Sequence, residues 1–362
     1  MPAPGVGARS AGTEIELVVR FPFAAGSTWN GTDVDFSGDF AYAGQMGPNG
    51  GVHVFDVGGR VPRKAGFFRC PGEQNDVAVV RPGILAVGYQ TSTCGPVSAG
   101  IQLLDVRDPA RIRPLGGIEI PDGTHTLTAY PGSDLLYSSP GGYWIEEDHE
   151  TIVDVSNPRK PKIVAEFDPG PAVGCHDVTF HFSEDRKLAA CAGESATQMW
   201  DVSDPLRPVV LGEIVNPSIH FHHLAAFTPD STHLVIGDEA WLGDDLGMCG
   251  IPQNHPTGAL WVYDVTNPAL PVLVSHFGLQ REGLSTTCTA HNFAFLPGTE
   301  KLAVAWYGGG MNVVDLADPA APEEVAYYKA ADSDYWSAFP YRGRIYANGR
   351  EGLDVLELRR AR

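Results

Sequence analysis

The chain has 362 residues, of which 43% are hydrophobic and 10% aromatic, enough for a large core and too many for an intrinsically disordered protein. Its 42 Gly and 29 Pro exceed their usual combined share of roughly 12%, which indicates many short elements joined by tight turns and excludes long helices. The formal net charge is −19, and because an acidic surface repels phosphate groups, we expect no nucleic-acid partner and no membrane partner.

The sequence contains no run of 18 apolar residues, so we expect no membrane-spanning helix. The N-terminal stretch lacks the basic start and apolar run of a secretory signal, which predicts a cytoplasmic location. In that compartment the six cysteines would be expected as free thiols.

The first predicted element is a strand over residues 13–21, which includes the alternating segment EIELVVRF. After it, an apolar pair followed by an acidic and an aliphatic residue recurs seven times. The copies are VFDV at 54–57, LLDV at 103–106, IVDV at 152–155, MWDV at 199–202, VYDV at 262–265, VVDL at 313–316 and VLEL at 355–358. One copy per ~52 residues matches the period of a four-stranded propeller blade.

Asp-Pro or Asn-Pro follows most of these copies, as at 157–158, 204–205, 267–268 and 318–319, and starts a turn. Short alternating segments come next, at 163–167, 209–214 and 272–277, and we predict that they are the outermost strands of successive blades. Each leads through a loop to an inner strand such as 178–180.

The last copy reaches the end of the chain without an outer strand, whereas the strand at 13–21 has no partner near it in the sequence. We therefore predict an all-β fold: a single seven-bladed β-propeller domain over residues 1–362, in which strand 13–21 joins the last blade and closes the ring. The segment IVDVSNPRKPKIV at 152–164 and its sister copies resemble the LVIVD-repeat proteins, which are β-propellers. The resemblance implies the fold and says little about activity, because this family is functionally diverse.

When the blades are aligned by their inner strands, the third to sixth blades carry a histidine at the same position. These residues are His125, His176, His222 and His291. Imidazoles from neighbouring blades would meet at one mouth of the channel, and neutral imidazole binds transition metals well. The pattern predicts a divalent metal site, with iron or copper favoured by the all-histidine set and zinc as another choice. A metal-free acid–base site and a purely structural role are the alternatives.

Glu194 and Glu239 end the second strands of the fourth and fifth blades and return to the same mouth. Together with His222 they are the candidate catalytic residues, either as a base or by orienting a histidine, although solvated carboxylates at the rim are the alternative. Asp177 and Asn292 directly follow two of the histidines and are candidate acceptors for their second ring nitrogens.

The longest interval between copies contains an extra loop at 240–258, which we predict to be a lid over this mouth. Its Cys249 would lie near Cys288, and Cys70 and Cys94 flank the same mouth. These two pairs weaken the expectation of free thiols.

The sequence therefore favours a metal-dependent enzyme, an oxidoreductase, that acts on a small organic molecule at one mouth of the channel. The alternatives are a metal-free lyase or cyclase that uses the channel histidines as acid and base, and a binding scaffold without catalysis.

Overall fold

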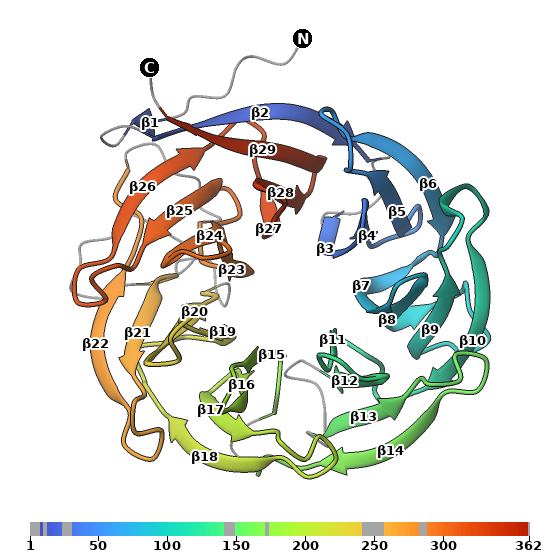
Figure 1. Cartoon of the computed structure of the whole chain (residues 1–362), viewed down its shortest axis with the longest axis horizontal. Helices are drawn as coiled ribbons and strands as arrows, with labels where there is room; N and C mark the ends of the chain where they lie inside the picture. The colour runs from blue at the N-terminus through green and yellow to red at the C-terminus, as the bar shows by residue number, and fades with distance from the viewer. Residues whose placement is uncertain are drawn as a thin grey trace.

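The computed structural model describes residues 8–9, 13–23, 31–140, 149–170, 174–240, 257–281 and 288–360. Seven antiparallel sheets form a ring around a central channel (Figure 1). In this part of the chain the only helix is the short 3₁₀ helix η1 (Pro109–Arg111). The structure thus confirms the predicted all-β, seven-bladed propeller. Among the described residues, no helix is long and apolar enough to cross a membrane.

Each blade is built on four strands. In the first six blades the chain runs through them from the channel outwards, whereas the outermost strand of the seventh blade precedes the first blade in the sequence. The innermost strands are β3 (Gly31–Ser37), β7 (Gly72–Arg81), β11 (Thr126–Ala129), β15 (Asp177–Phe182), β19 (His222–Phe227), β23 (Phe293–Phe295) and β27 (Tyr335–Tyr341). The second strands are β4 (Phe40–Gln45), β8 (Ile84–Ser92), β12 (Leu135–Ser139), β16 (Lys187–Gly193), β20 (His233–Asp238), β24 (Lys301–Ala305) and β28 (Arg344–Gly349).

The third strands carry the sequence repeat; they are β5 (Gly51–Asp56), β9 (Gly100–Asp105), β13 (Glu150–Asp154), β17 (Ala196–Asp201), β21 (Leu260–Asp264), β25 (Met311–Asp315) and β29 (Gly352–Arg360). The outermost strands are β6 (Arg63–Arg69), β10 (Arg113–Glu119), β14 (Lys162–Phe167), β18 (Val209–Ile214), β22 (Val272–Phe277), β26 (Glu323–Tyr328) and β2 (Thr13–Pro22). A two-residue strand, β1 (Ala8–Arg9), pairs with β26 at the outer edge of the sixth blade.

The repeated aspartate has a structural role, because it ends the third strand and starts the turn to the outermost strand. In six blades its carboxylate accepts a hydrogen bond from the backbone amide two residues later; the residues are Asp56, Asp105, Asp154, Asp201, Asp264 and Asp315. The Asp or Asn that precedes the proline makes the same bond in the next turn, for example at Asn157 and Asp204. Two successive turns of this kind connect the third strand of a blade to its outermost strand. Because each of the first six blades has one such connection, the motif recurs once per blade.

Seven hydrophobic clusters hold the ring together, and each one joins two neighbouring blades. Trp200, for example, is fully buried between the third and fourth blades, and Phe55 is fully buried between the seventh and first. The main hydrophobic cores therefore lie between the blades, around the central channel.

Strand β2 closes the ring by pairing with β29 over its whole length, from Thr13 opposite Arg360 to Pro22 opposite Gly352. Arg20 of β2 donates two hydrogen bonds of 2.7 Å to Asp354, whose side chain is only 2% exposed. The predicted closing strand at 13–21 is therefore present in the last blade.

Glu150, at the start of β13, is a buried carboxyl group that gives the fold a pH dependence. Ser139 donates a 2.9 Å hydrogen bond to one of its oxygens, and the other oxygen has no hydrogen-bond partner among the described residues. Burial raises the pKa of Glu150 from 4.5 to about 8. Because the pKa is higher in the folded than in the unfolded chain, the stabilisation from this group is present at acid pH and is lost as the pH rises from 4.5 towards 8.

We expect Glu150→Gln to stabilise the protein at pH 8.5 by about 2–4 kcal/mol, because the amide stays neutral and keeps a bond to Ser139. At pH 4 the same change should have little effect. Denaturant unfolding at both pH values measures the difference, with Glu166→Gln on the exposed side of β14 as the control. An equal effect at both pH values would contradict the assignment.

Candidate metal centre

Four imidazole rings lie in a row at one mouth of the channel, each from the next blade along the ring. The ring centroids are 4.3 Å apart between His125 and His176, 4.3 Å between His176 and His223, and 3.9 Å between His223 and His291. The rings of His176, His223 and His291 are buried, with exposed fractions of 5%, 2% and 1%. The structure thus brings histidines of four consecutive blades together at this mouth.

In the fifth blade the structure places His223 in this row, where the sequence register pointed to His222. The cause is a β-bulge at the start of β19, where the register with β20 shifts between His222 and Leu224. A bulge re-aims the side chains on either side of it. His222 instead forms a 2.8 Å hydrogen bond through Nδ1 with the hydroxyl group of Thr197.

Glu239 follows β20 and lies against two of the four histidines. Its carboxylate oxygens are 3.4 Å from Nε2 of His223 and 3.5 Å from Nε2 of His291. One donor atom from each of these three residues lies within 4.8 Å of the other two, a spacing that can hold a metal ion. The predicted Glu239 is thus brought to the histidines, as the register of the second strands suggested.

Glu194 is the equivalent residue of the fourth blade. Its backbone exchanges two hydrogen bonds with that of His222, and it is not one of the three residues whose donor atoms converge. Of the two carboxylates predicted from the sequence, Glu194 and Glu239, only Glu239 is therefore one of the converging residues.

Two further contacts orient the donor atoms. The hydroxyl group of Tyr307 donates a 2.5 Å hydrogen bond to Oε1 of Glu239. The carbonyl oxygen of Trp336 lies 2.6 Å from Nδ1 of His291 and accepts a hydrogen bond from the Nδ1–H group. The lone pair of the ring is then on Nε2, the atom beside Glu239. Such contacts to the remaining atoms of a ligand are typical of metal sites in proteins.

Burial keeps the histidines neutral at physiological pH. It lowers the pKa of His176 to about 4 and that of His291 to about 3, and it lowers the pKa of His125 and His223 well below the usual value. Burial also raises the pKa of Glu239 to about 8, against the opposing effect of the Tyr307 hydrogen bond. Neutral imidazole is the form that binds a metal, and a cation at this point would replace the proton of Glu239.

A cavity of about 10 Å³ adjoins the row on the channel axis. That volume accommodates about one water molecule. Its lining includes His125, His176 and His223 on one side and Asp33 and Asp76 on the other. Asn292, one of the two expected acceptors for a ring nitrogen, instead donates a 2.5 Å hydrogen bond to Asp33.

The cysteines near this mouth form disulfides, which corrects the first expectation of free thiols. Cys70 and Cys94 are bonded, as their positions suggested, and a second disulfide joins Cys175, next to His176, to Cys191. No free cysteine occurs in the described part of the chain. Disulfides are common in oxidising compartments, so these two count against the predicted cytoplasmic location.

Two other sequence predictions lie outside the described residues. Cys249 is not described, so the proposed Cys249–Cys288 pair stays a prediction. The same holds for the lid at 240–258, of which 241–256 are not described.

Comparisons with known proteins support the fold and the repeat. Residues 150–168, which span β13 and β14, match the model of the LVIVD repeat. A solved structure, the β-propeller domain of Cps50 (Swd1) from Myceliophteria thermophila, superposes with a TM-score of 0.61 at 13% identity, over 95% of this chain and 100% of that chain. No curated protein matches the sequence significantly. The chain is a seven-bladed β-propeller that carries an LVIVD repeat.

Proposed function

We propose that the chain is a metal-dependent oxidoreductase whose divalent metal is bound by His223, Glu239 and His291. The observation that carries the proposal is the convergence of one donor atom from each of these buried residues within 4.8 Å. Two histidines and one carboxylate leave coordination positions open, and this donor set is the one that non-haem iron(II) oxygenases use. A site made only of histidines would suit iron and copper equally well. Because one ligand here is the carboxylate of Glu239, iron is favoured over copper.

The neighbouring residues have distinct parts in this proposal. Tyr307 would hold the Glu239 carboxylate in place, and the Trp336 carbonyl would hold the His291 ring in the tautomer that binds through Nε2. His176 extends the row on the other side of His223, and its Nδ1 atom is buried without a hydrogen-bond partner among the described residues. It is the candidate for a fourth ligand.

The substrate class follows from the size and burial of the site. The three ligands are 1–8% exposed, so only a small organic molecule would reach the open positions. The metal would supply activation of dioxygen, which takes up electrons from the substrate as the substrate is oxidised. The protein would supply binding, orientation and exclusion of bulk water.

Metal analysis of protein purified without a histidine tag tests the proposal. We expect about one iron or copper per chain, and a loss of most of it in His223→Ala, His291→Ala and Glu239→Ala. His222→Gln is the matched control, because it changes the adjacent histidine and can keep the bond to Thr197. His233→Ala, on β20 and outside the row, is a second control.

Full metal retention in all three ligand variants would contradict the proposal, as would protein that takes up neither metal after incubation with it. If the protein takes up neither metal, a binding scaffold without a metal is the better description. Loss of metal in His222→Gln but not in His223→Ala would instead support the original register from the sequence.

A further inference from the structure

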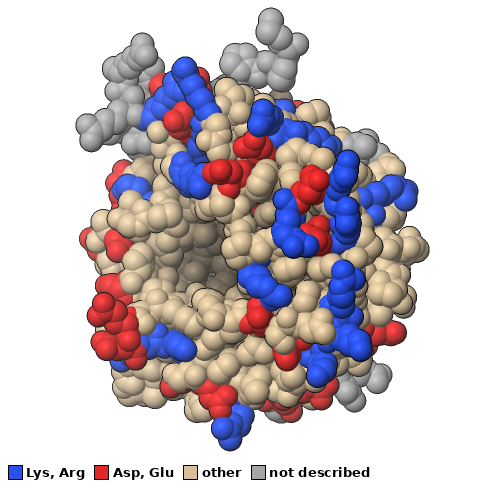
Figure 2. Space-filling view, turned by 45° about the vertical axis from the view of Figure 1, so that its right-hand side comes forward, with Lys and Arg blue, Asp and Glu red and all other residues tan. Residues whose placement is uncertain are grey.

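A second, larger cavity fills the channel beyond the histidine row. It has a volume of about 660 Å³ and is lined by the innermost strands of all seven blades. Figure 2 shows the ring hollowed at its centre, with a wall of uncharged residues. This volume lies within the range of sites for small organic ligands, which is about 300–1,000 Å³.

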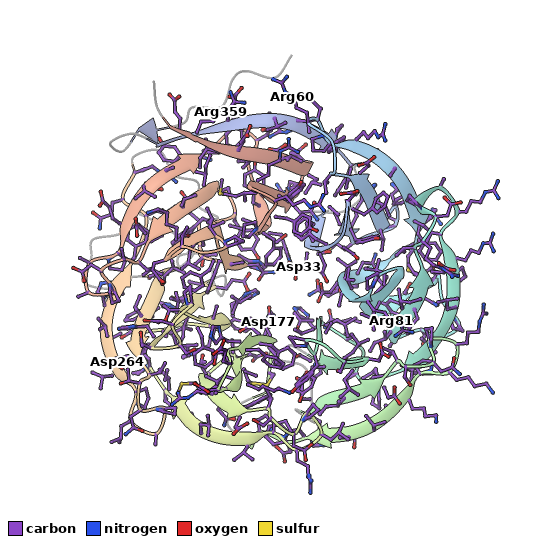
Figure 3. The ribbon with its side chains drawn as sticks, viewed as in Figure 1. Asp33, Arg60, Arg81, Asp177, Asp264 and Arg359 are labelled. Carbon is purple, nitrogen blue, oxygen red and sulfur yellow. A yellow bond between two sulfur atoms is a disulfide. The ribbon has the colours of Figure 1, made fainter. Side chains whose placement is uncertain are left out.

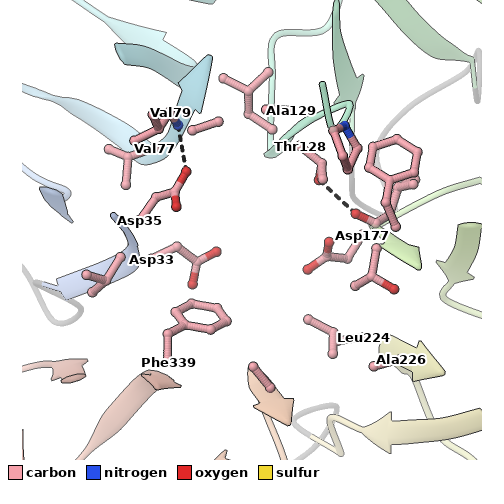
Figure 4. Close-up of a pocket in the computed structure, with 18 of the residues that line it drawn as sticks. Asp33, Asp35, Val77, Val79, Thr128, Ala129, Asp177, Leu224, Ala226 and Phe339 are labelled. Atoms are coloured by element: carbon pink, nitrogen blue, oxygen red, sulfur yellow. Dashed lines mark hydrogen bonds between the residues drawn. The ribbon is translucent and has the colours of Figure 1, made fainter. Parts of the chain in front are cut away.

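The wall of this cavity is mostly apolar. Val79, Ala129, Leu224, Ala226 and Phe339 project into it from four different blades (Figure 4). A single ion would leave most of such a surface without contact. The wall suits the hydrocarbon part of an organic molecule.

The end of the cavity nearest the histidines is acidic. Asp33, Asp76 and Asp177 line it there, and Asp33 and Asp76 also line the small cavity beside the histidines. Figure 4 shows Asp33 and Asp177 at the cavity, with Asp35 beside Asp33. Figure 3 shows Asp33 and Asp177 near the centre of the ring, whereas Asp264 and Arg359 lie at its outer edge. Among the described residues that line the cavity, none is Lys or Arg, so the protein supplies no cation to these carboxyl groups.

The carboxyl groups differ in the partners they already have. Asp35 accepts a 2.6 Å hydrogen bond from the Val79 amide, and the two oxygens of Asp76 accept from Val77 and Leu127. Asp177 is 7% exposed and faces the cavity, and the following backbone amide is its one recorded hydrogen-bond donor within the described chain. A buried carboxylate with an unused oxygen directed into a cavity favours a donor from a ligand.

We propose that this cavity binds an organic cation, a molecule with an ammonium group and an apolar body. The ammonium group lies among Asp33, Asp76 and Asp177, and the body lies against the apolar wall formed by residues such as Leu224 and Phe339. An ammonium group offers three donors and a positive charge, which satisfies Asp177 and offsets the repulsion between the carboxyl groups. An anion of the same shape would be repelled, and a neutral molecule would leave the charges uncompensated.

This proposal is independent of the metal centre, because His223, Glu239 and His291 do not line the larger cavity. The two can therefore fail separately. If the Glu239→Gln protein contains no metal and still binds the amine, the cavity proposal is supported. The metal proposal is then decided by the metal analysis alone.

Calorimetric titration with three probes of equal chain length tests the cavity. We expect n-octylamine, a cation at pH 7, to bind at least about 10-fold more tightly than neutral n-octanol, and octanoate to show no binding. Asp177→Asn, which keeps the shape of the side chain, should weaken octylamine binding about 10-fold and leave octanol unchanged. Asp122→Asn, at an exposed carboxylate outside the cavity, is the control.

Ala226→Phe provides a second variant that keeps every carboxyl group and fills part of the apolar wall; it should weaken both octylamine and octanol. Thermal melting of each variant shows that it is folded. Equal affinity for octylamine and octanol, or unchanged octylamine affinity in folded Asp177→Asn, would overturn the proposal.

Discussion

Deletion of residues 1–21 should lower the melting temperature by at least about 10 °C or leave the protein unable to fold. The deletion removes most of β2, the outermost strand of the last blade, and leaves the edge of β29 unpaired. It also removes both Arg20 bonds to Asp354, a side chain that is 2% exposed. Loss of one partner from a buried ion pair alone costs about 3–5 kcal/mol.

Deletion of residues 1–12 is the matched control, because it removes β1 and keeps β2. We expect the melting temperature of this shorter deletion to stay close to that of the full chain. Differential scanning calorimetry compares the three proteins. Equal melting of the 1–21 deletion and the full chain would show that β2 does not stabilise the ring.

The second large effect concerns metal affinity. We expect Glu239→Gln to lower the affinity for iron(II) by at least about 100-fold, because an amide is a weaker ligand than a carboxylate and carries no charge. Tyr307→Phe should lower it by about 10–100-fold, because the carboxylate loses the 2.5 Å hydrogen bond that orients it. Competition with a chromophoric chelator measures both affinities.

Tyr137→Phe is the control for the tyrosine variant. Its hydroxyl group donates a 2.6 Å hydrogen bond to the Pro205 carbonyl and lies outside the metal centre. A Tyr307→Phe protein with the affinity of the unchanged chain would show that Tyr307 does not position Glu239.

Much of the fold could be predicted because one local interaction recurs in six of the seven blades. The aspartate of the repeat caps a turn, so its position marks the end of a third strand whatever the rest of the blade contains. Strand order and closure then followed from the missing outer strand of the last blade. Nothing in the repeat indicates β1, a two-residue strand whose residues carry no alternating pattern.

The metal centre was predictable only to within one residue. A strand alternates its faces with a period of two, so the bulge between His222 and Leu224 decides which of two adjacent histidines faces its neighbours. Sequence alone does not show a bulge. Tyr307, by contrast, follows β24, the second strand of the sixth blade, close to the position that Glu239 occupies after β20 in the fifth blade. The alignment of the blades therefore already indicated that Tyr307 lies near Glu239.

The acidic end of the larger cavity was also present in the sequence. Asp33, Asp76 and Asp177 each follow the aligned position at which other blades carry histidine, and they recur in the first, second and fourth blades. Asp177 was considered only as a partner for a histidine ring. The disulfide between Cys175 and Cys191 depends on pairing between β15 and its neighbour β16, which the spacing of the two cysteines does not reveal.

The closure of the last blade also governs how the chain is made. Strand β2 precedes all the other blade strands in the sequence, whereas its partner β29 follows them. Because synthesis runs from the N-terminus to the C-terminus, β2 has no partner until β29 has been made, and its buried residue Ile15 lacks the neighbours that it has in the closed ring. Closure joins residues as far apart as Arg20 and Asp354, which are separated by 334 positions, so it carries a large loop-closure entropy and a chain that lacks β29 cannot complete it.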